Sequence, residues 1–221
     1  MKVRRIFGVF LMIALFALGS ASAKDTGASS NYLALGDSVA FGYIDQAGYE
    51  YYYPTNFVGY ADYDGLTLSL NVMDAGCPGE TTSSFISSTG PDNGCRPYRM
   101  HFPLHVVYGS AKSTQLAFAT GFLQHHSDTG LVTINLGAND LFLLEQECNG
   151  DPTCIANGAP QVFATAAANM QTILAGLRAT GYNGAIVIVN YYSLDYSNQF
   201  VTELTAGLNQ AISAQIGRAH V

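Results

Sequence analysis

The chain has 221 residues, of which 48% are hydrophobic and 11% are charged, and its formal net charge is −7. This length suits one folded domain with a substantial core, and the spread of glycine and proline along the chain excludes a wholly disordered protein. Nine lysines and arginines stand against 16 aspartates and glutamates, so no basic stripe can neutralise phosphates and we expect no nucleic-acid partner.

Residues 1–23 have the three-part layout of a secretory signal peptide. Lys2, Arg4 and Arg5 precede an apolar run over residues 6–18, and small residues up to Ala23 follow. The run is too short for a comfortable membrane span, so we expect cleavage after Ala23, secretion to an extracellular or periplasmic space, and no stable membrane insertion. The alternative is an uncleaved N-terminal anchor. Cleavage leaves six basic residues against 16 acidic ones, a net charge of −10.

Export would place the four cysteines in an oxidising compartment, where they are expected to pair. Of the three possible connectivities we prefer Cys77 with Cys95 and Cys148 with Cys154, because each pair closes a short loop between predicted elements. Metal binding is the alternative. It is disfavoured because the paired C-x2-C spacing of a zinc site is absent and no histidine is close to either pair.

Strands and helices alternate along the remainder of the chain. Apolar runs predict strands at 32–35, which a glycine turn follows, and at 131–136 and 185–189, which are rich in β-branched residues. A partial alternation of apolar residues predicts a further strand at 66–73. Helical spacing of apolar residues predicts helices at 113–125, 161–177 and 199–215. This order predicts an α/β fold with a doubly wound parallel sheet, whose ligands bind beyond the carboxyl ends of the strands. The functional residues should therefore lie at 36–43, 74–81 and 137–142.

Three short blocks at these strand ends resemble the GDSL, or SGNH, hydrolase family in the family's own order. The first block is Gly36-Asp37-Ser38-Val39-Ala40-Phe41-Gly42-Tyr43, the second begins Cys77-Pro78-Gly79-Glu80, and the third is Gly137-Ala138-Asn139-Asp140. The resemblance implies a three-layer α/β/α, flavodoxin-like domain over residues 24–215. It also implies a hydrolase of carboxylic esters that needs no cofactor and no metal.

The residue types in these blocks suit acyl transfer. A serine hydroxyl on a tight strand-to-helix turn can attack an ester carbonyl, and hydrogen-bond donors must meet the charge that develops on the carbonyl oxygen. The family resemblance implies that Ser38 is the nucleophile and that the donors are the backbone N–H groups of Ser38 and Gly79 and the side-chain amide of Asn139. Alternatively, Ser38 is a helix N-cap and Gly79 and Asn139 are turn residues. Asp37 and Asp140 are expected to hold their turns through local hydrogen bonds.

A fourth family block, Asp-x-x-His, supplies the general base, and this chain does not contain it. None of His101, His105, His125, His126 and His220 has aspartate three residues before it. We expect His125 and His126 at the end of the sheet opposite Ser38, and we expect a substitute role for His101 or His105 only as a minor alternative. Residues 216–221 also match one reading frame of a common sequencing-library adapter. Two explanations compete: a chain that lost its base by divergence, and a gene model that stops early. We expect the second, with genuine sequence ending at Gln215, the last strand and the base missing, and little turnover from this chain.

The substrate is not fixed by these residues. Seven of the 14 tyrosines fall between Tyr43 and Tyr63, where they either wall a pocket for an acyl chain or a sugar or simply pack a loop. The expected partner is a small-molecule or lipid ester. The alternatives are a carbohydrate acetylesterase and a non-catalytic secreted binding protein on the same scaffold. A nucleotide-binding module is disfavoured because the first turn lacks G-x-G-x-x-G and the chain has no P-loop.

Overall fold

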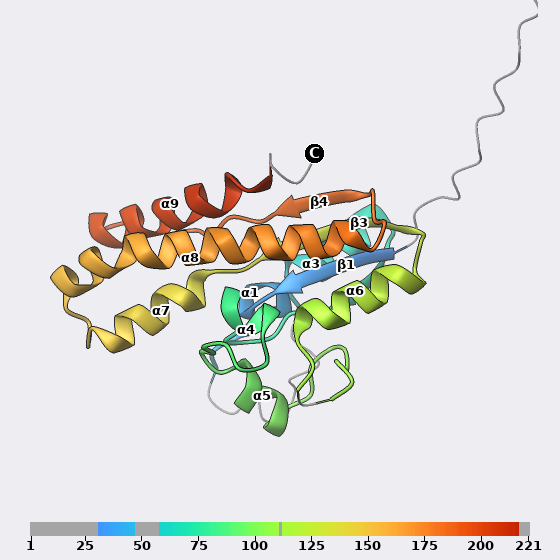
Figure 1. Ribbon diagram of the computed structural model, residues 1–221, viewed down its shortest axis with the longest axis horizontal. Helices are drawn as coiled ribbons and strands as arrows, with labels where there is room; N and C mark the ends of the chain where they lie inside the picture. Colours follow the sequence, from blue (N-terminus) through green and yellow to red (C-terminus); the bar gives the residue numbers. More distant parts are fainter. Residues whose placement is uncertain (1–30, 47–57, 111, 217–221) are drawn as a thin grey trace, which may run out of the picture.

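A computed structural model describes residues 31–46, 58–110 and 112–216 of the chain (Figure 1). Within these ranges a four-stranded, all-parallel sheet has the strand order β2-β1-β3-β4. The strands are β1 (Asn31–Gly36), β2 (Asn71–Asp74), β3 (Thr129–Asn135) and β4 (Ala185–Ile188). The predicted parallel α/β fold is confirmed. The expected signal peptide and His220 lie outside the described residues.

The central strand β1 is the most deeply buried element of the sheet. Tyr32, Leu33, Ala34 and Leu35 are each 0% exposed, because β1 pairs with β2 on one side and with β3 on the other and helices cover both faces. This explains why its sequence is continuously apolar and not alternating. The one hydroxyl buried here, on Tyr32, lies 2.8 Å from the hydroxyl of Thr133 on β3 and is hydrogen-bonded to it.

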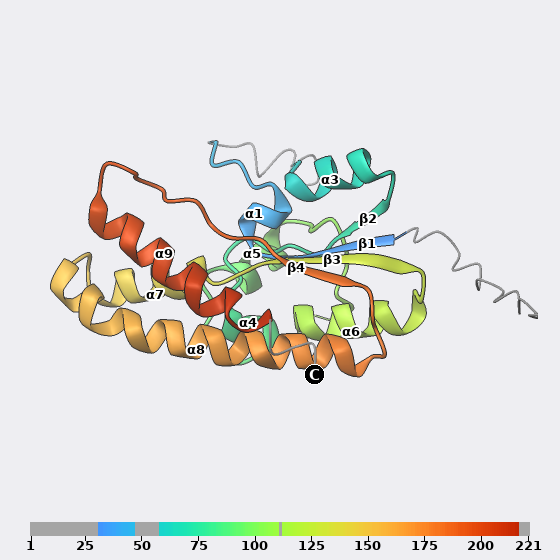
Figure 2. The same ribbon diagram turned by 90° about the horizontal axis from the view of Figure 1, so that it is seen from above.

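Helices form a layer on each face of this sheet (Figure 2). Helix α3 (Tyr60–Leu68) covers one face, and α6 (Gln115–His125) and α8 (Pro152–Ala179) cover the other. The short helices α1 (Ser38–Phe41), α4 (Thr82–Ile86) and α7 (Ala138–Glu147) follow β1, β2 and β3. Helix α5 (Cys95–His101) packs near α1, and α9 (Gln199–Ser213) packs along α8. The three-layer arrangement is thus the expected one.

The strand predicted at 66–73 is wrong over its first half. Residues up to Leu68 belong to α3, Ser69 has a left-handed φ of 55° that ends the helix, and only Asn71–Asp74 pair as a strand. The partial alternation of apolar residues misled the prediction because Leu66 is 82% exposed and Leu68 is 55% exposed on the outer side of the helix. Alternation of apolar residues normally indicates which side chains of a strand are buried, but the apolar residues of this segment are exposed.

The three predicted helices are present with different bounds. The predicted helix at 161–177 is the C-terminal part of α8, which begins nine residues earlier at Pro152. Asp151 caps this earlier start by accepting a hydrogen bond from the Cys154 amide, and proline is well tolerated in the first turn of a helix. The helix then continues through Pro160 and ends before Gly181, which has φ 87°.

Both predicted disulfides are confirmed. Cys77 pairs with Cys95 across a separation of 18 residues, and Cys148 pairs with Cys154 across six. Within the described ranges, no helix combines the length and the hydropathy that crossing a bilayer requires.

Candidate active site

The turns that follow β1, β2 and β3 meet at the carboxyl edge of the sheet, as expected for this fold. The Asp37 amide donates to the Asn135 carbonyl at 3.1 Å, and the Cys77 amide donates to the Gly36 carbonyl at 3.0 Å. A cavity of about 850 Å³ opens at this edge and is lined by Ser38 and Asn139 but not by Gly79. Two of the three predicted site residues therefore face the same space.

Ser38 is the first residue of the four-residue helix α1. The alternative reading of Ser38 as the N-cap is wrong, because the cap is Asp37, whose carboxylate accepts from the Val39 amide at 3.0 Å. The turn closes at Gly42, where φ is 73° and an added Cβ would lie 2.3 Å from the Gly59 amide nitrogen. Ser38 is thus half-buried on a short, tightly closed turn at the cavity wall.

The side-chain amide of Asn139 is held on every side. Its nitrogen donates to the Glu80 carbonyl at 2.9 Å and to the Asp37 carboxylate at 3.3 Å, and its oxygen accepts from the Asn93 side chain at 2.8 Å. Asn93 in turn accepts from Gln146 at 2.9 Å. This chain of bonds fixes which end of the amide is the donor. Asn139 is therefore more than a turn residue, because it ties the β1, β2 and β3 turns together.

Gly79 combines a turn with a close backbone approach. Its φ of 85° is in the left-handed region, and an added Cβ would lie 2.6 Å from the Asn93 carbonyl oxygen. Its own carbonyl accepts from the Asn93 amide at 3.1 Å, and the neighbouring Glu80 amide donates to the Cys77 carbonyl at 3.0 Å. Only glycine fits this position.

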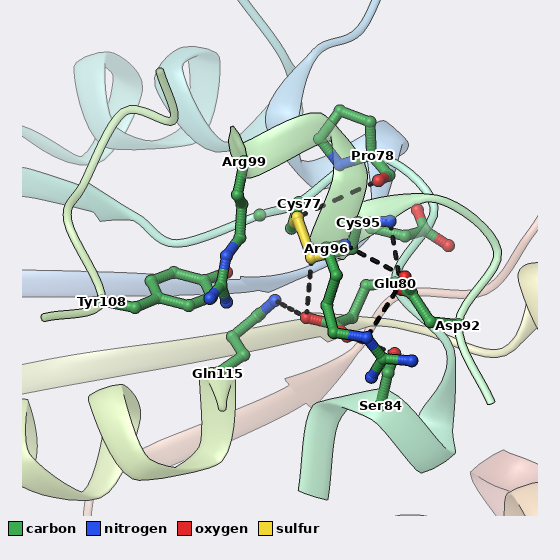
Figure 3. The surroundings of a disulfide bond; sticks show 12 residues. Cys77, Pro78, Glu80, Ser84, Asp92, Cys95, Arg96, Arg99, Tyr108 and Gln115 are labelled. Atoms are coloured by element: carbon green, nitrogen blue, oxygen red, sulfur yellow. Dashed lines mark hydrogen bonds and ion pairs between the residues drawn. A yellow bond between two sulfur atoms is a disulfide. The ribbon is translucent and has the colours of Figure 1, made fainter. Parts of the chain in front are cut away.

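The Gly79 loop is braced by the Cys77–Cys95 disulfide and by the buried side chain of Glu80 (Figure 3). The Glu80 carboxylate accepts from the Ser84 hydroxyl and, at 3.2 Å, from the Gln115 side chain. Burial raises the pKa of Glu80 to about 7 from an ordinary 4.5. The Cys77 and Cys95 sulfurs and a Glu80 oxygen lie within 4.8 Å of one another, but the disulfide occupies both sulfurs and leaves no thiolate for a metal.

Gln115 connects this brace to the first turn. Its side chain accepts from the Gly36 amide at 2.6 Å and donates to the Gly36 carbonyl at 2.9 Å, although 79 residues separate the two. The start of α6 is therefore fixed to the end of β1, directly before Asp37 and Ser38.

Tyr191 is a site residue that the sequence reading missed. It follows β4, lines the cavity, and donates its hydroxyl hydrogen to the Asp37 carboxylate. Asn209 on α9 holds its backbone through two hydrogen bonds of 2.9 Å and 2.8 Å. Burial raises the pKa of Asp37 to about 6, while the bonds from Tyr191, Val39 and Asn139 work in the opposite direction. Tyr191 could have been found from its position after β4, because the carboxyl end of that strand lies on the same edge of the sheet as the three motifs.

The Asp140 carboxylate interacts with its own backbone amide, as expected for a turn residue, and it also reaches a distant turn. Its carboxylate accepts from the Thr82 amide at 2.9 Å and from the Thr82 hydroxyl at 2.6 Å, 58 residues away. It therefore joins the start of α7 to the start of α4, and burial raises its pKa. Asp37 does cap its own turn, as expected, and it also makes the two distant bonds described above.

None of the four histidines in the described residues lines the cavity. The imidazole Nε2 of His105 lies 3.0 Å from the Phe41 carbonyl oxygen and 3.8 Å from the Asp74 carboxylate. His105 therefore contacts the last residue of α1 and does not line the cavity. His101 is an exposed residue in the last turn of α5. His125 ends α6 and His126 caps it, directly before β3 begins at Thr129, so both lie at the amino end of that strand and opposite Ser38, as expected.

Three tyrosines of the cluster fall within the described residues, and one of these three lines the cavity. Tyr43 lines the cavity, whereas the Tyr60 hydroxyl lies 3.3 Å from Thr133 against the sheet and Tyr63 is 70% exposed. The remaining four, Tyr49 and Tyr51 to Tyr53, lie outside the described residues.

No family model matches the sequence, and no curated protein matches it. Solved structures do match. A phospholipase A1 from Streptomyces albidoflavus NA297 is similar with a TM-score of 0.55 and 16% identity, over 87% of this chain and 77% of that one. The lipase Lip_vut3 from a goat rumen metagenome is similar with a TM-score of 0.51 and 16% identity, over 84% and 75%. The chain thus has the α/β fold of the SGNH hydrolases, which confirms the expected resemblance at the level of the fold.

Proposed function

We propose that this chain is a secreted serine ester hydrolase in which Ser38 attacks the carbonyl carbon of a carboxylic ester. The single observation that carries the proposal is that Ser38 and Asn139, which come from the ends of two adjacent strands, line one cavity. The fold shared with a lipase and a phospholipase supports the reaction class. The expected signal peptide and the two disulfides support secretion.

In the proposed reaction the Ser38 oxygen bonds to the carbonyl carbon and its proton passes to a base. The negative charge on the carbonyl oxygen is met by the backbone N–H groups of Ser38 and Gly79 and by the Asn139 amide. The Asn139 side-chain nitrogen makes two hydrogen bonds, and the bond to Asp37, at 3.3 Å, is the longer. We assign the N–H group of this longer bond to the carbonyl oxygen of the substrate. Collapse releases the alcohol, and water then hydrolyses the acyl-enzyme.

One observation favours a second candidate, a secreted binding protein with no turnover. None of the described histidines lines the cavity, and a serine without a base is a weak nucleophile. An assay in which imidazole supplies the base separates the two candidates.

The test is hydrolysis of p-nitrophenyl esters by the disulfide-bonded chain, with and without added imidazole. A Ser38→Ala variant measures the background reaction of imidazole alone. We expect hydrolysis above that background, and we expect Asn139→Ala to lower kcat by ~10²–10³ with KM nearly unchanged, because the lost donor acts on charge that develops in the transition state. Equal rates for the native chain and Ser38→Ala under all conditions would refute the proposal and leave the binding protein.

A further inference from the structure

The cavity extends well beyond Ser38 and becomes apolar as it does so. Beyond the polar end formed by Asp37, Ser38, Asn139 and Tyr191, its walls include side chains of α7, the first turn of α8, and α9, together with loop residues that follow α1 and β4. The apolar members of this extension are Leu141, Phe142, Ile155, Phe200, Leu204 and Leu208. Helix α7, the first part of α8, and the start of α9 lie together beyond the carboxyl edge of the sheet (Figure 2).

Helical spacing makes this wall continuous with the proposed oxyanion site. On α7 the lining residues are spaced as one face of the helix, so Asn139 is followed along that face by Phe142 and then Glu145. On α9 the lining residues Val201, Leu204 and Leu208 repeat at three and four positions and also form one face. A group attached to a carbonyl carbon at Ser38 therefore has an apolar path that begins at the same helix face as Asn139.

The cavity wall also includes the turn between α7 and α8, which is covalently fixed. Gly150, Pro152 and Ile155 line the cavity where α7 turns into α8, and the Cys148–Cys154 disulfide spans that turn. The lining stretch from Asn139 to Glu145 rises ~9 Å, and the whole of α7 rises ~15 Å. An extended chain advances ~1.2 Å per bond, so these lengths correspond to about 8 to 12 bonds.

The charges of the lining residues exclude an anionic occupant. Besides Asp37, the charged side chains that line the cavity are Asp45, Glu145 and Asp195, and no lysine or arginine lines it within the described residues. A free carboxylate or phosphate would therefore meet repulsion with no cationic partner. An uncharged apolar chain would pack against the apolar lining residues without this repulsion.

We propose that the apolar extension binds the acyl chain of the substrate, so that the preferred substrates are uncharged esters of medium-chain fatty acids and not acetyl esters. This proposal rests on the assignment of Ser38 above, because Ser38 fixes the end at which the carbonyl sits. The Cys148–Cys154 turn sets the limit of chain length.

Binding is measured apart from chemistry, on the Ser38→Ala variant. Methyl esters from acetate to decanoate are titrated by calorimetry, and we expect affinity to rise by about fourfold per methylene, which corresponds to ~0.8 kcal/mol, until the cavity is filled. Leu204→Trp should abolish the rise in affinity for the longer esters and leave the affinity for the short esters unchanged. Leu66→Trp, on the exposed face of α3, is the control and should leave the whole series unchanged.

Phe142→Ala provides a second variant should Leu204→Trp not fold, and it should move the plateau to a longer chain. A flat affinity series, or a rising series that both cavity variants leave unchanged, would overturn the proposal. The two proposals fail separately. A rising series, with no turnover by the native chain above the Ser38→Ala background even with imidazole, refutes the hydrolase alone, whereas faster turnover of acetate than of decanoate esters refutes the acyl site alone.

Discussion

The side-chain amide of Asn93 donates a hydrogen bond of 2.8 Å to the side-chain oxygen of Asn139, a residue 46 positions away. This bond leaves the nitrogen of Asn139 directed at the Glu80 carbonyl and the Asp37 carboxylate. Asn93 is itself placed by the Gly79 carbonyl, which accepts from its backbone amide at 3.1 Å. Asn93 is thus the residue that joins two of the proposed oxyanion donors, Gly79 and Asn139.

Replacement of Asn93 should impair the donor role of Asn139 without removing Asn139 itself. Asn93→Ala is expected to lower kcat about fivefold with KM unchanged, because the loss of one hydrogen bond, about 1 kcal/mol, frees the amide to rotate. Asn93→Asp should be no better, since a carboxylate cannot donate to the Asn139 oxygen. Gln146→Ala, which removes only the outer bond of the chain, should cost less than Asn93→Ala. Equal losses in all three variants would contradict a positioning role for Asn93.

Tyr191→Phe tests the hydroxyl that meets Asp37. Asp37 has a pKa of about 6, so above that pH the hydroxyl stabilises a buried carboxylate and below it only a neutral acid. We expect the variant to lose ~1.5–3 kcal/mol of unfolding free energy at pH 8 and ~1 kcal/mol at pH 5, because hydrogen bonds to charged groups are the stronger ones. Urea unfolding at both pH values measures this, and Tyr192→Phe, at an exposed tyrosine, is the control. A loss independent of pH would contradict the assignment.

Glu80→Gln should remove part of the pH dependence of stability. The folded-state pKa of Glu80 is about 7 against an ordinary 4.5, so its protonated form contributes stability that is fully present below pH 4.5 and is lost as pH rises through 7. The expected loss is about 3 kcal/mol across this window. Thermal unfolding between pH 4 and 8 should show a shallower decline for Glu80→Gln than for the native chain. A parallel decline would mean that Glu80 does not titrate in this range.

Gly79→Ala tests the left-handed turn against a matched glycine. Gly79 has a φ of 85°, and a Cβ added to it would lie 2.6 Å from a backbone oxygen. A Cβ added to Gly121, inside α6, would have no atom of another part of the chain within 4 Å. We expect Gly79→Ala to destabilise the fold by ~1–3 kcal/mol and Gly121→Ala to stabilise it by ~0.5–1 kcal/mol. Calorimetric melting of the two variants gives the comparison, and the same sign for both would be inconsistent with the described backbone.

The two disulfides should differ in their contribution to stability. Loop-closure entropy gives ~3 kcal/mol for the pair separated by 18 residues and ~2 kcal/mol for the pair separated by six. The double variant Cys77→Ser/Cys95→Ser should therefore melt at a lower temperature than Cys148→Ser/Cys154→Ser. Only the first should also reduce ester hydrolysis of short substrates, because it alone braces the Gly79 loop. The reverse order of melting temperatures would argue against these roles, and so would a loss of hydrolysis in the second variant alone.

Much of the site could be read from the sequence because its determinants are local. Gly36-Asp37-Ser38 and Gly137-Ala138-Asn139 are turns whose form depends on a few adjacent residues, and parallel strands carry such turns to one edge of the sheet. The cysteine pairs could also be assigned from the sequence, because each pair closes a short loop and its partners are near each other along the chain. The helix α3 could not be recognised, since an alternating pattern does not reveal which side chains meet solvent.

The amino-acid sequence by itself therefore determined the parallel α/β fold, both disulfides, and the placing of Ser38 and Asn139 at one edge. The tertiary structure alone decided that Tyr191 meets Asp37, that Asn93 orients Asn139, and that α7, α8 and α9 contribute the apolar part of one cavity. These contacts join residues 46 to 154 positions apart. Such contacts depend on how whole elements pack, and the spacing of residues within one element carries no information about them.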